Sequence, residues 1–466
     1  MSAATTTPAA TRAEVELMAH LIRRAGFGAR RDELDTYCAA GYEATVEALL
    51  NPQPDACDYG DFTDHDLVDR YFTASWSARG PGNARPHWGW RMLTSPRPLE
   101  EKIALFWHGV FATGGTKFPL SGVAQLEQID MFRRYGLGRF ETLLGQQLSR
   151  DPAMLYWLDN QHNHRDAPNE NYGRELLELF SLGVGNYTEA DVKAAARAFT
   201  GWTITPMHSL NFLGIFPVRF VYDATDHDDG EKTFLGYTGR FDGDDIVRIL
   251  AAHPAAARFV CGRLYRFFVA DTPNEAEIDR LAGVFTASDG EIRAVLRAIF
   301  TSPHFAAPAV RYRRVKSPVE LVFGTARLTD RFPLPHHDVT VLGYATHYMG
   351  QSLLNPPSVE GWHDGEEWID SACLMERINF AAAEIGRRDA PGIRRILDRV
   401  AAAGPRLPPD AMVDACLDAL GALAVSARTR AVLVEHVGDA VDAAAEPDRV
   451  VTLLQAVVAT PDYQYC

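Results

Sequence analysis

Apolar side chains recur at helical spacing along almost the whole of this 466-residue chain, and this periodicity predicts a mostly α-helical fold. A large multi-helix domain with a small β-hairpin insertion and a C-terminal helical lobe is the expected architecture. The predicted helices cover residues 12–25, 31–40, 42–50, 98–111, 122–135, 139–149, 153–158, 168–182, 244–265, 275–285 and 291–300.

Local signals predict where several of these helices begin and end. Thr188 with Asp191 three residues later has the form of a capping box, and so does Ser317 with Glu320. Gly183 is placed to close the helix over 168–182 in a left-handed conformation.

One stretch, residues 203–239, breaks the helical pattern. Residues 216–222 alternate between apolar and polar, and glycines bound residues 232–237, so we expect a β-hairpin or small sheet inserted in a helical protein. The expected organisation is a disordered tail over 1–12, a main helical domain over 13–400 and a C-terminal helical lobe over 401–466. A long loop over 351–370 carries two tryptophans, and loops of this length are often functional.

The charge of the chain limits its partners. The formal net charge is −15 with a pI near 5.5, which argues against nucleic acid or an anionic membrane as the main partner. No apolar run approaches the length of a membrane span, and the amino terminus lacks the basic start and apolar core of a secretory signal. The cytoplasm is therefore the expected compartment.

The segment 168–202 is the densest in ionisable side chains. Helical spacing places Glu170, Arg174 and Glu178 on one stripe, with Glu175 about 60° beyond Glu178. These residues form either a solvated ladder of ion pairs or the wall of a cleft. In a cleft, carboxylates around one arginine would have pKa values pushed apart, as acid–base catalysis or metal binding requires.

Two histidines add to the candidates. His108 lies within an apolar helix over 98–111 and is either a core residue or a base facing the same cavity as Glu175. His227 lies in an acidic turn late in the insertion and could help to hold a cation. His108, Glu175 and His227 are thus weak candidates for ligands of a divalent metal. Glu178 stands where the di-metal motif of helical bundles requires histidine.

Seven ordered motifs indicate a family. They are HLIRRAGFG at His20, EKIALFWHGVFAT at Glu101, SRDPAMLYWLDNQHN at Ser149, the block over 168–202, KTFLG at Lys232, KSPVELVFG at Lys316 and MGQSLLNPPSVEGW at Met349. Together they resemble the bacterial family called domain of unknown function 1800, over residues 17–385. The resemblance implies a mostly helical protein.

The resemblance also implies features beyond the fold. Many members of that family are exported and encoded beside a second family that resembles sulfatases and phosphatases, which suggests a partner protein of that kind. Many relatives have histidine where this chain has Val110 and Phe180, and the apolar replacements weaken the case for a metal site.

Two classes of function follow from the sequence. The first is an enzyme with hydrolytic or acid–base chemistry on a small polar, carbohydrate-like substrate. In it Arg174 would bind negative charge, a glutamate of raised pKa would be the acid and His108 the base. The second is a non-catalytic binding or assembly protein, in which the same residues form a structural network.

Overall fold

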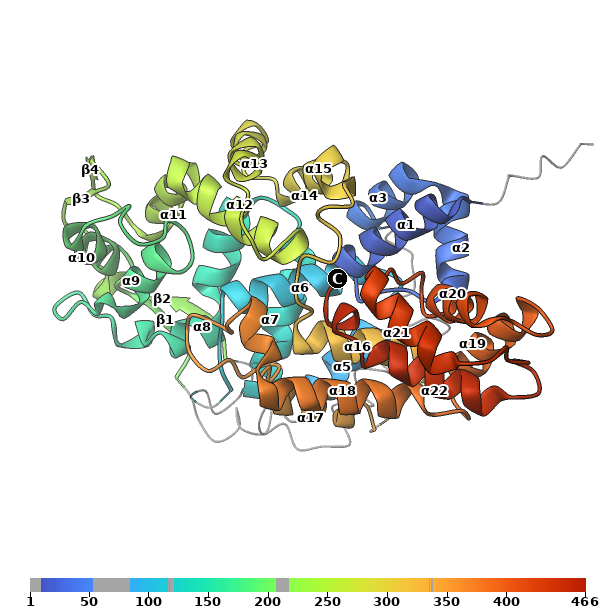
Figure 1. Ribbon diagram of the computed structural model, residues 1–466. Helices are drawn as coiled ribbons and strands as arrows, with labels where there is room; N and C mark the ends of the chain where they lie inside the picture. Colours follow the sequence, from blue (N-terminus) through green and yellow to red (C-terminus); the bar gives the residue numbers. More distant parts are fainter. Residues whose placement is uncertain are drawn as a thin grey trace, which may run out of the picture.

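The computed structural model describes residues 10–52, 84–115, 117, 121–206, 218–334, 336 and 338–466, and helices make up most of that part of the chain. Figure 1 shows an elongated arrangement, with the β-strands at one end and the C-terminal helices at the other. The α-helices are α1 (Arg12–Ala25), α2 (Arg31–Ala40), α3 (Tyr42–Leu50), α5 (Ala84–Thr94), α6 (Pro98–Val110), α7 (Ser121–Tyr135), α8 (Pro152–Trp157), α9 (Glu170–Glu178), α10 (Glu189–Ala198), α11 (Gly243–Ala252), α12 (Pro254–Phe268), α13 (Glu275–Ala287), α14 (Ile292–Phe300), α15 (Pro303–Ala306), α16 (Pro318–Thr329), α17 (Val339–Tyr348), α18 (Ser371–Ile385), α19 (Pro391–Ala402), α20 (Pro409–Ala419), α21 (Ala427–Val437) and α22 (Pro447–Val458).

The mostly helical fold with a small β insertion is confirmed. Strand β1 (Trp202–Ile204) pairs antiparallel with β2 (Phe220–Tyr222), and β3 (Lys232–Phe234) forms a hairpin with β4 (Tyr237–Gly239). Leu235 and Gly236 join the hairpin strands with positive φ angles of 47° and 84°, as a tight two-residue turn requires. The first part of the predicted strand, residues 216 and 217, lies outside the described residues, as do residues 1–9 of the predicted tail.

Both predicted capping boxes are present. The side chains of Thr188 and Ser317 each accept a hydrogen bond from the backbone amide three residues later. The carboxylates of Asp191 and Glu320 in turn accept one from the backbone amide of the cap residue. These reciprocal bonds satisfy backbone donors that a helix start would otherwise leave unpaired. Gly183 has the predicted left-handed conformation, with φ of 78°.

Two predicted helices have backbone hydrogen bonds that differ from those of the continuous α-helices expected. The helix predicted over 139–149 is a π-helix (Thr142–Gln147) followed by a 3₁₀ turn (Leu148–Arg150). Helix α9 ends at Glu178 instead of near residue 182, because the amides of Leu182 and Gly183 both donate to the carbonyl of Leu177 in a wide closing turn. Apolar spacing locates a helix but does not specify which carbonyl each amide reaches.

A single cluster of buried apolar side chains runs from Val15 to Tyr463 and joins most helices of the described chain. Helix α6 lies near the middle of this core, and almost all its side chains are buried. The C-terminal helices α20 and α22 contribute to the same core through residues such as Val413 and Leu454. No helix within the described ranges combines the length and apolar character that a bilayer span needs.

Candidate functional site

The Glu170–Arg174 stripe lies on the outer side of α9. Tyr172, Gly173 and Leu176 face inward, and a Cβ on Gly173 would lie 3.0 Å from the backbone nitrogen of Ala196 in α10. This close packing of α9 on α10 turns the opposite face toward solvent.

Arg174 is held by two carboxylates at this surface. Its Nη2 lies 3.1 Å from Glu170 and 2.7 Å from Glu189, and its side chain keeps 34% of its exposure. The hydrogen bonds that Arg174 donates to Glu189, followed by its attraction to Glu170, raise the pKa of the guanidinium. Arg174 is therefore a charged surface side chain that already has partners.

Glu175 and Glu178 have different surroundings. Tyr187 donates a hydrogen bond of 2.6 Å to Glu178, while Glu175 is half-buried. Burial raises the pKa of Glu175, and the nearby charges of Glu178 and Glu360 raise it further. Glu175 therefore has the raised pKa that an acid catalyst needs.

His108 is fully buried in α6. Its ring lies edge-on to Trp88 at 5.5 Å and to Trp362 at 5.3 Å between centroids. Neither ring nitrogen has a hydrogen-bond partner in the described structure. Burial lowers the pKa of His108 to about 3, so the imidazole is uncharged at neutral pH.

The weak metal candidates do not form a group. His227 places Nδ1 2.9 Å from the carbonyl oxygen of Thr200, and its Nε2 is 4.0 Å from Asp229. Among the residues that the structure describes, no three or more His, Cys, Asp or Glu side chains are arranged to hold a metal ion.

The predicted long loop docks on α6 beside His108. Gly361 has φ of 88°, and a Cβ there would lie 2.3 Å from the carbonyl oxygen of Gly109. Trp362 then contacts the His108 ring, and the Glu360 carboxylate interacts electrostatically with both Glu175 and Arg263. The loop thus connects the predicted residues His108 and Glu175 to a cleft on the far side of Trp362.

We call this cleft the arginine cleft; the space within it and at its mouth, open solvent included, amounts to about 590 Å³. It lies between α6, α12, the start of α16 and the long loop. Its lining residues are Leu105, Phe106, Gly109, Val110, Arg263, Arg266, Phe267, Arg314, Ser317, Gln351, Trp362 and Asp364. Cationic side chains outnumber carboxylates in this lining by three to one.

Two of the three arginines have no ion pair. Within the described part of the chain, no carboxylate oxygen lies within 4.0 Å of the Arg263 or Arg266 guanidinium groups, although Arg263 stacks on Phe259 at 4.9 Å. Burial lowers the pKa of Arg263, and the charge of Asp364 opposes this effect. Arg263 and Arg266 can therefore accept an anion without first losing a protein partner.

The third arginine belongs to a buried ionic cluster beneath the cleft. Arg314 and Lys102 both contact Glu320, and Arg24 lies 4.0 Å from the same carboxylate. Burial disfavours ionisation of Glu320, but the attraction of Arg314, Lys102 and Arg24 is larger and holds its pKa well below the usual value. The arrangement keeps Glu320 charged.

Positive charge exceeds negative charge in this interior. The buried cations whose charges interact with Glu320 are Arg24, Lys102, Arg314, Lys316 and Arg377. The buried carboxylate of Glu320 and the negative charge at Cys466 therefore face five cations, in a chain whose formal net charge is −15. Buried charges are costly unless they are paired, so such a surplus suits an anionic ligand.

Sequence reasoning did not select the arginines of the cleft. Arg263 and Arg266 are three residues apart on one helix face, and Arg314 belongs to the basic run over 311–316. Either signal could have indicated an anion site, but only the fold shows that both face one cleft.

Comparison with known proteins gives one match. No curated protein and no solved structure is significantly similar to this chain. The sequence model of a protein family described as "Protein of unknown function (DUF1800)" matches residues 20–465. The match extends beyond the predicted 17–385 and takes in the C-terminal helices. The chain therefore belongs to the DUF1800 family of proteins of unknown function.

Proposed function

We propose that this protein binds a small molecule bearing an oxyanion (phosphate, sulfate or carboxylate) in the arginine cleft. The observation that carries the proposal is the convergence of Arg263, Arg266 and Arg314 on one cleft, with the first two free of ion pairs in the described structure. Guanidinium groups match the geometry of oxyanions with paired hydrogen bonds.

Neighbouring groups support the same ligand class. Ser317 lines the cleft and caps α16, so the positive end of that helix dipole lies at the cleft wall. Trp362 and Phe267 add flat apolar surfaces against which a ring or sugar could pack. An oxyanion attached to a polar, carbohydrate-like body fits this mixture.

The test is a calorimetric titration of the purified protein with inorganic phosphate and inorganic sulfate. We expect saturable binding, which Arg263→Gln and Arg266→Gln should each weaken by roughly tenfold. Arg258→Gln is the matched control, since Arg258 lies on the same helix and pairs with Glu275 at 2.7 Å. Absence of binding to wild type, or an equal loss in the control, would refute the proposal.

A second candidate function is hydrolytic or acid–base catalysis at the mouth of this cleft. It is favoured by the raised pKa of Glu175 and by the electrostatic interaction of Glu360 with both Glu175 and Arg263. Glu175 would donate a proton while the arginines hold the negative group of the substrate. His108 would then support Trp362 instead of acting as a base, because burial lowers its pKa to about 3 and leaves the imidazole a poor proton acceptor.

This candidate is tested with chromogenic para-nitrophenyl glycosides and phosphate esters. Glu175→Gln should abolish any turnover found and leave oxyanion binding intact. Equal turnover in Glu175→Gln and wild type would refute the catalytic role. Binding without turnover would support the non-catalytic alternative.

We further propose a cytoplasmic location and a partner protein for this chain. A cytoplasmic location is tested by fractionation of cells that produce the protein. A partner from a family resembling sulfatases and phosphatases is tested by co-purification, with the Arg263→Gln variant showing whether the cleft is involved.

A further inference from the structure

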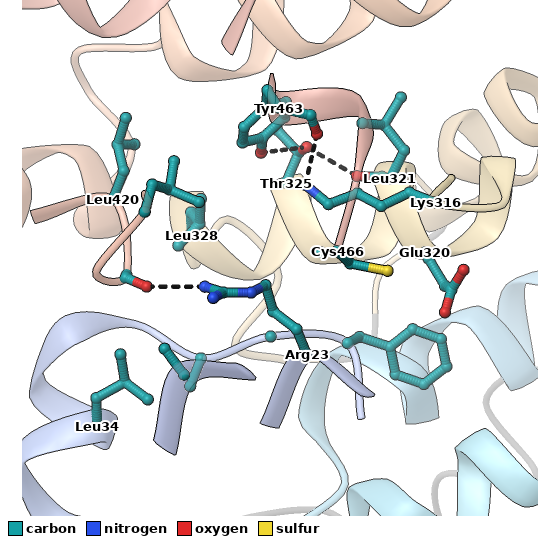
Figure 2. A pocket seen from close by; sticks show the side chains of 17 residues that line it. Arg23, Leu34, Lys316, Glu320, Leu321, Thr325, Leu328, Leu420, Tyr463 and Cys466 are labelled. Atoms are coloured by element: carbon teal, nitrogen blue, oxygen red, sulfur yellow. Dashed lines mark hydrogen bonds between the residues drawn. The ribbon is translucent and has the colours of Figure 1, made fainter. Parts of the chain in front are cut away.

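A second cavity lies on the other side of the segment 314–320. It is bounded by α1, α16, the turn after α20 and the last residues of the chain, and it opens to solvent (Figure 2). The space within it and at its mouth, open solvent included, amounts to about 550 Å³. We call it the lysine cavity. Its lining shares no residue with the arginine cleft: Arg314 and Ser317 face that cleft, whereas Lys316 and Glu320 face this cavity.

Lys316 is the most unusual group in the lining. The residue is only 8% exposed, and its ammonium donates a hydrogen bond of 2.7 Å to the carbonyl oxygen of Tyr463. The ammonium also lies 3.9 Å from the centroid of the Tyr463 ring. Within the described ranges no carboxylate lies within ion-pair distance of Lys316, because Glu320 is engaged by Lys102 and Arg314.

Arg23 supplies a second cation without a carboxylate partner in the described structure. Its guanidinium donates to the hydroxyl of Tyr312 at 2.9 Å and to the carbonyl oxygen of Gly421 at 3.2 Å. Its Nε is buried without an acceptor. The charge of Arg23 is near enough to Lys316 to disfavour protonation of that lysine. Two neighbouring cations thus share one cavity.

The rest of the cavity is mainly apolar. Figure 2 shows Leu34, Leu328 and Leu420 on one side, Lys316 and Cys466 on the other, and Arg23 between them. A ligand that fits both ends has an apolar chain and one anionic head. Contact with three leucines favours the chain through the hydrophobic effect, and the two cations favour the head.

We infer that the lysine cavity binds an amphipathic monocarboxylate, with the carboxylate between Lys316 and Arg23 and the alkyl chain against Leu34, Leu328 and Leu420. The inference is independent of the oxyanion site, because the two cavities have separate linings. A single negative charge suits the site, since Cys466 and Glu320 already offset part of the positive charge around Lys316.

Proton uptake should accompany binding. Burial lowers the pKa of Lys316 to about 7 in the free protein; the negative charge at Cys466 opposes this effect, and the positive charge of Arg23 adds to it. A bound carboxylate favours the charged amine, so binding above about pH 7 requires lysine to take up a proton. Affinity for the carboxylate should therefore fall as the pH rises through neutrality.

The experiment is calorimetric titration of the full chain with sodium decanoate, below its micelle-forming concentration, and with decanol as the uncharged analogue. We expect decanoate to bind at about pH 6 and to bind roughly tenfold more weakly or worse at about pH 9. Decanol should bind weakly and without pH dependence. Lys316→Met should reduce decanoate affinity by roughly tenfold or more and remove its pH dependence.

One control variant and one stability measurement complete the test. Lys193→Met, which removes an exposed lysine of α10, should leave decanoate binding unchanged. Thermal unfolding checks that Lys316→Met is folded, which is expected because it removes a buried charge without an ion pair. Equal affinity for decanoate and decanol, or unchanged decanoate binding in Lys316→Met, would overturn the inference.

Discussion

Replacing Glu320 by glutamine should be among the most damaging single changes to this protein. The side chain keeps its shape, but the buried carboxylate that lies within 4.0 Å of Arg24, Lys102 and Arg314 loses its charge. Removing one partner of a buried ion pair costs about 3–5 kcal/mol, because the other charges stay buried without compensation. Domains have only about 5–15 kcal/mol of net stability, so the loss should be large in any unfolding experiment.

The assay is urea unfolding at neutral pH, followed by circular dichroism. Glu376→Gln is the control, because Glu376 is an exposed residue of α18 and has no ion pair within the described structure. The double variant Lys102→Met with Glu320→Gln should recover part of the loss, since it removes one of the stranded cations.

The pH dependence has a definite sign. The folded-state pKa of Glu320 is held well below 4.5, so its contribution to stability is fully present above the unfolded-state value. That contribution is lost only in acid, as the pH falls through the folded-state pKa. The difference in unfolding free energy between wild type and Glu320→Gln should thus be large at neutral pH and should disappear at low pH. If Glu320→Gln unfolds at the same urea concentration as Glu376→Gln, the charge of Glu320 does not stabilise the buried cations, and the prediction is wrong.

Three further predictions concern other sites. Lys316→Met should be more stable than wild type near neutrality. Burial lowers the pKa of Lys316 from 10.5 to about 7, so between these two pH values the unfolded wild-type chain binds more protons than the folded one. Urea titrations should therefore show the difference in unfolding free energy between variant and wild type shrinking as the pH rises from about 7. Gly361→Ala should displace the long loop from α6, because the new Cβ would lie 2.3 Å from the carbonyl oxygen of Gly109. Acrylamide should then quench the tryptophan fluorescence more strongly than in wild type. In the control Gly365→Ala the nearest atom to the new Cβ is 3.7 Å away, so the increase in quenching should be smaller. Arg174→Gln should change neither the thermal midpoint nor oxyanion binding appreciably, since the ion pairs of Arg174 are at the surface. A large loss of stability or of binding would show that the Glu170–Arg174 stripe of α9 takes part in the binding site.

Features that depend on near neighbours in the chain were predictable. Helices α1, α2 and α3 have the predicted bounds, and the capping boxes at Thr188 and Ser317 formed, because their signals lie within a few residues. Helical periodicity also placed Glu170, Arg174 and Glu178 on one stripe. The periodicity did not determine that this stripe faces solvent, since that depends on the packing of α9 against α10.

The sequence alone therefore determined a mostly helical protein with a β insertion and the approximate position of most of its helices. Tertiary structure decided which charges meet. Lys102 and Glu320 are 218 residues apart, and Arg263 reaches the same cleft as Arg314 only because α12 and the start of α16 both lie beside α6. Hydrophobic burial brings these elements together without regard to charge. The surplus of positive charge that marks both cavities is consequently a property of the packed core, which local patterns in the chain do not encode.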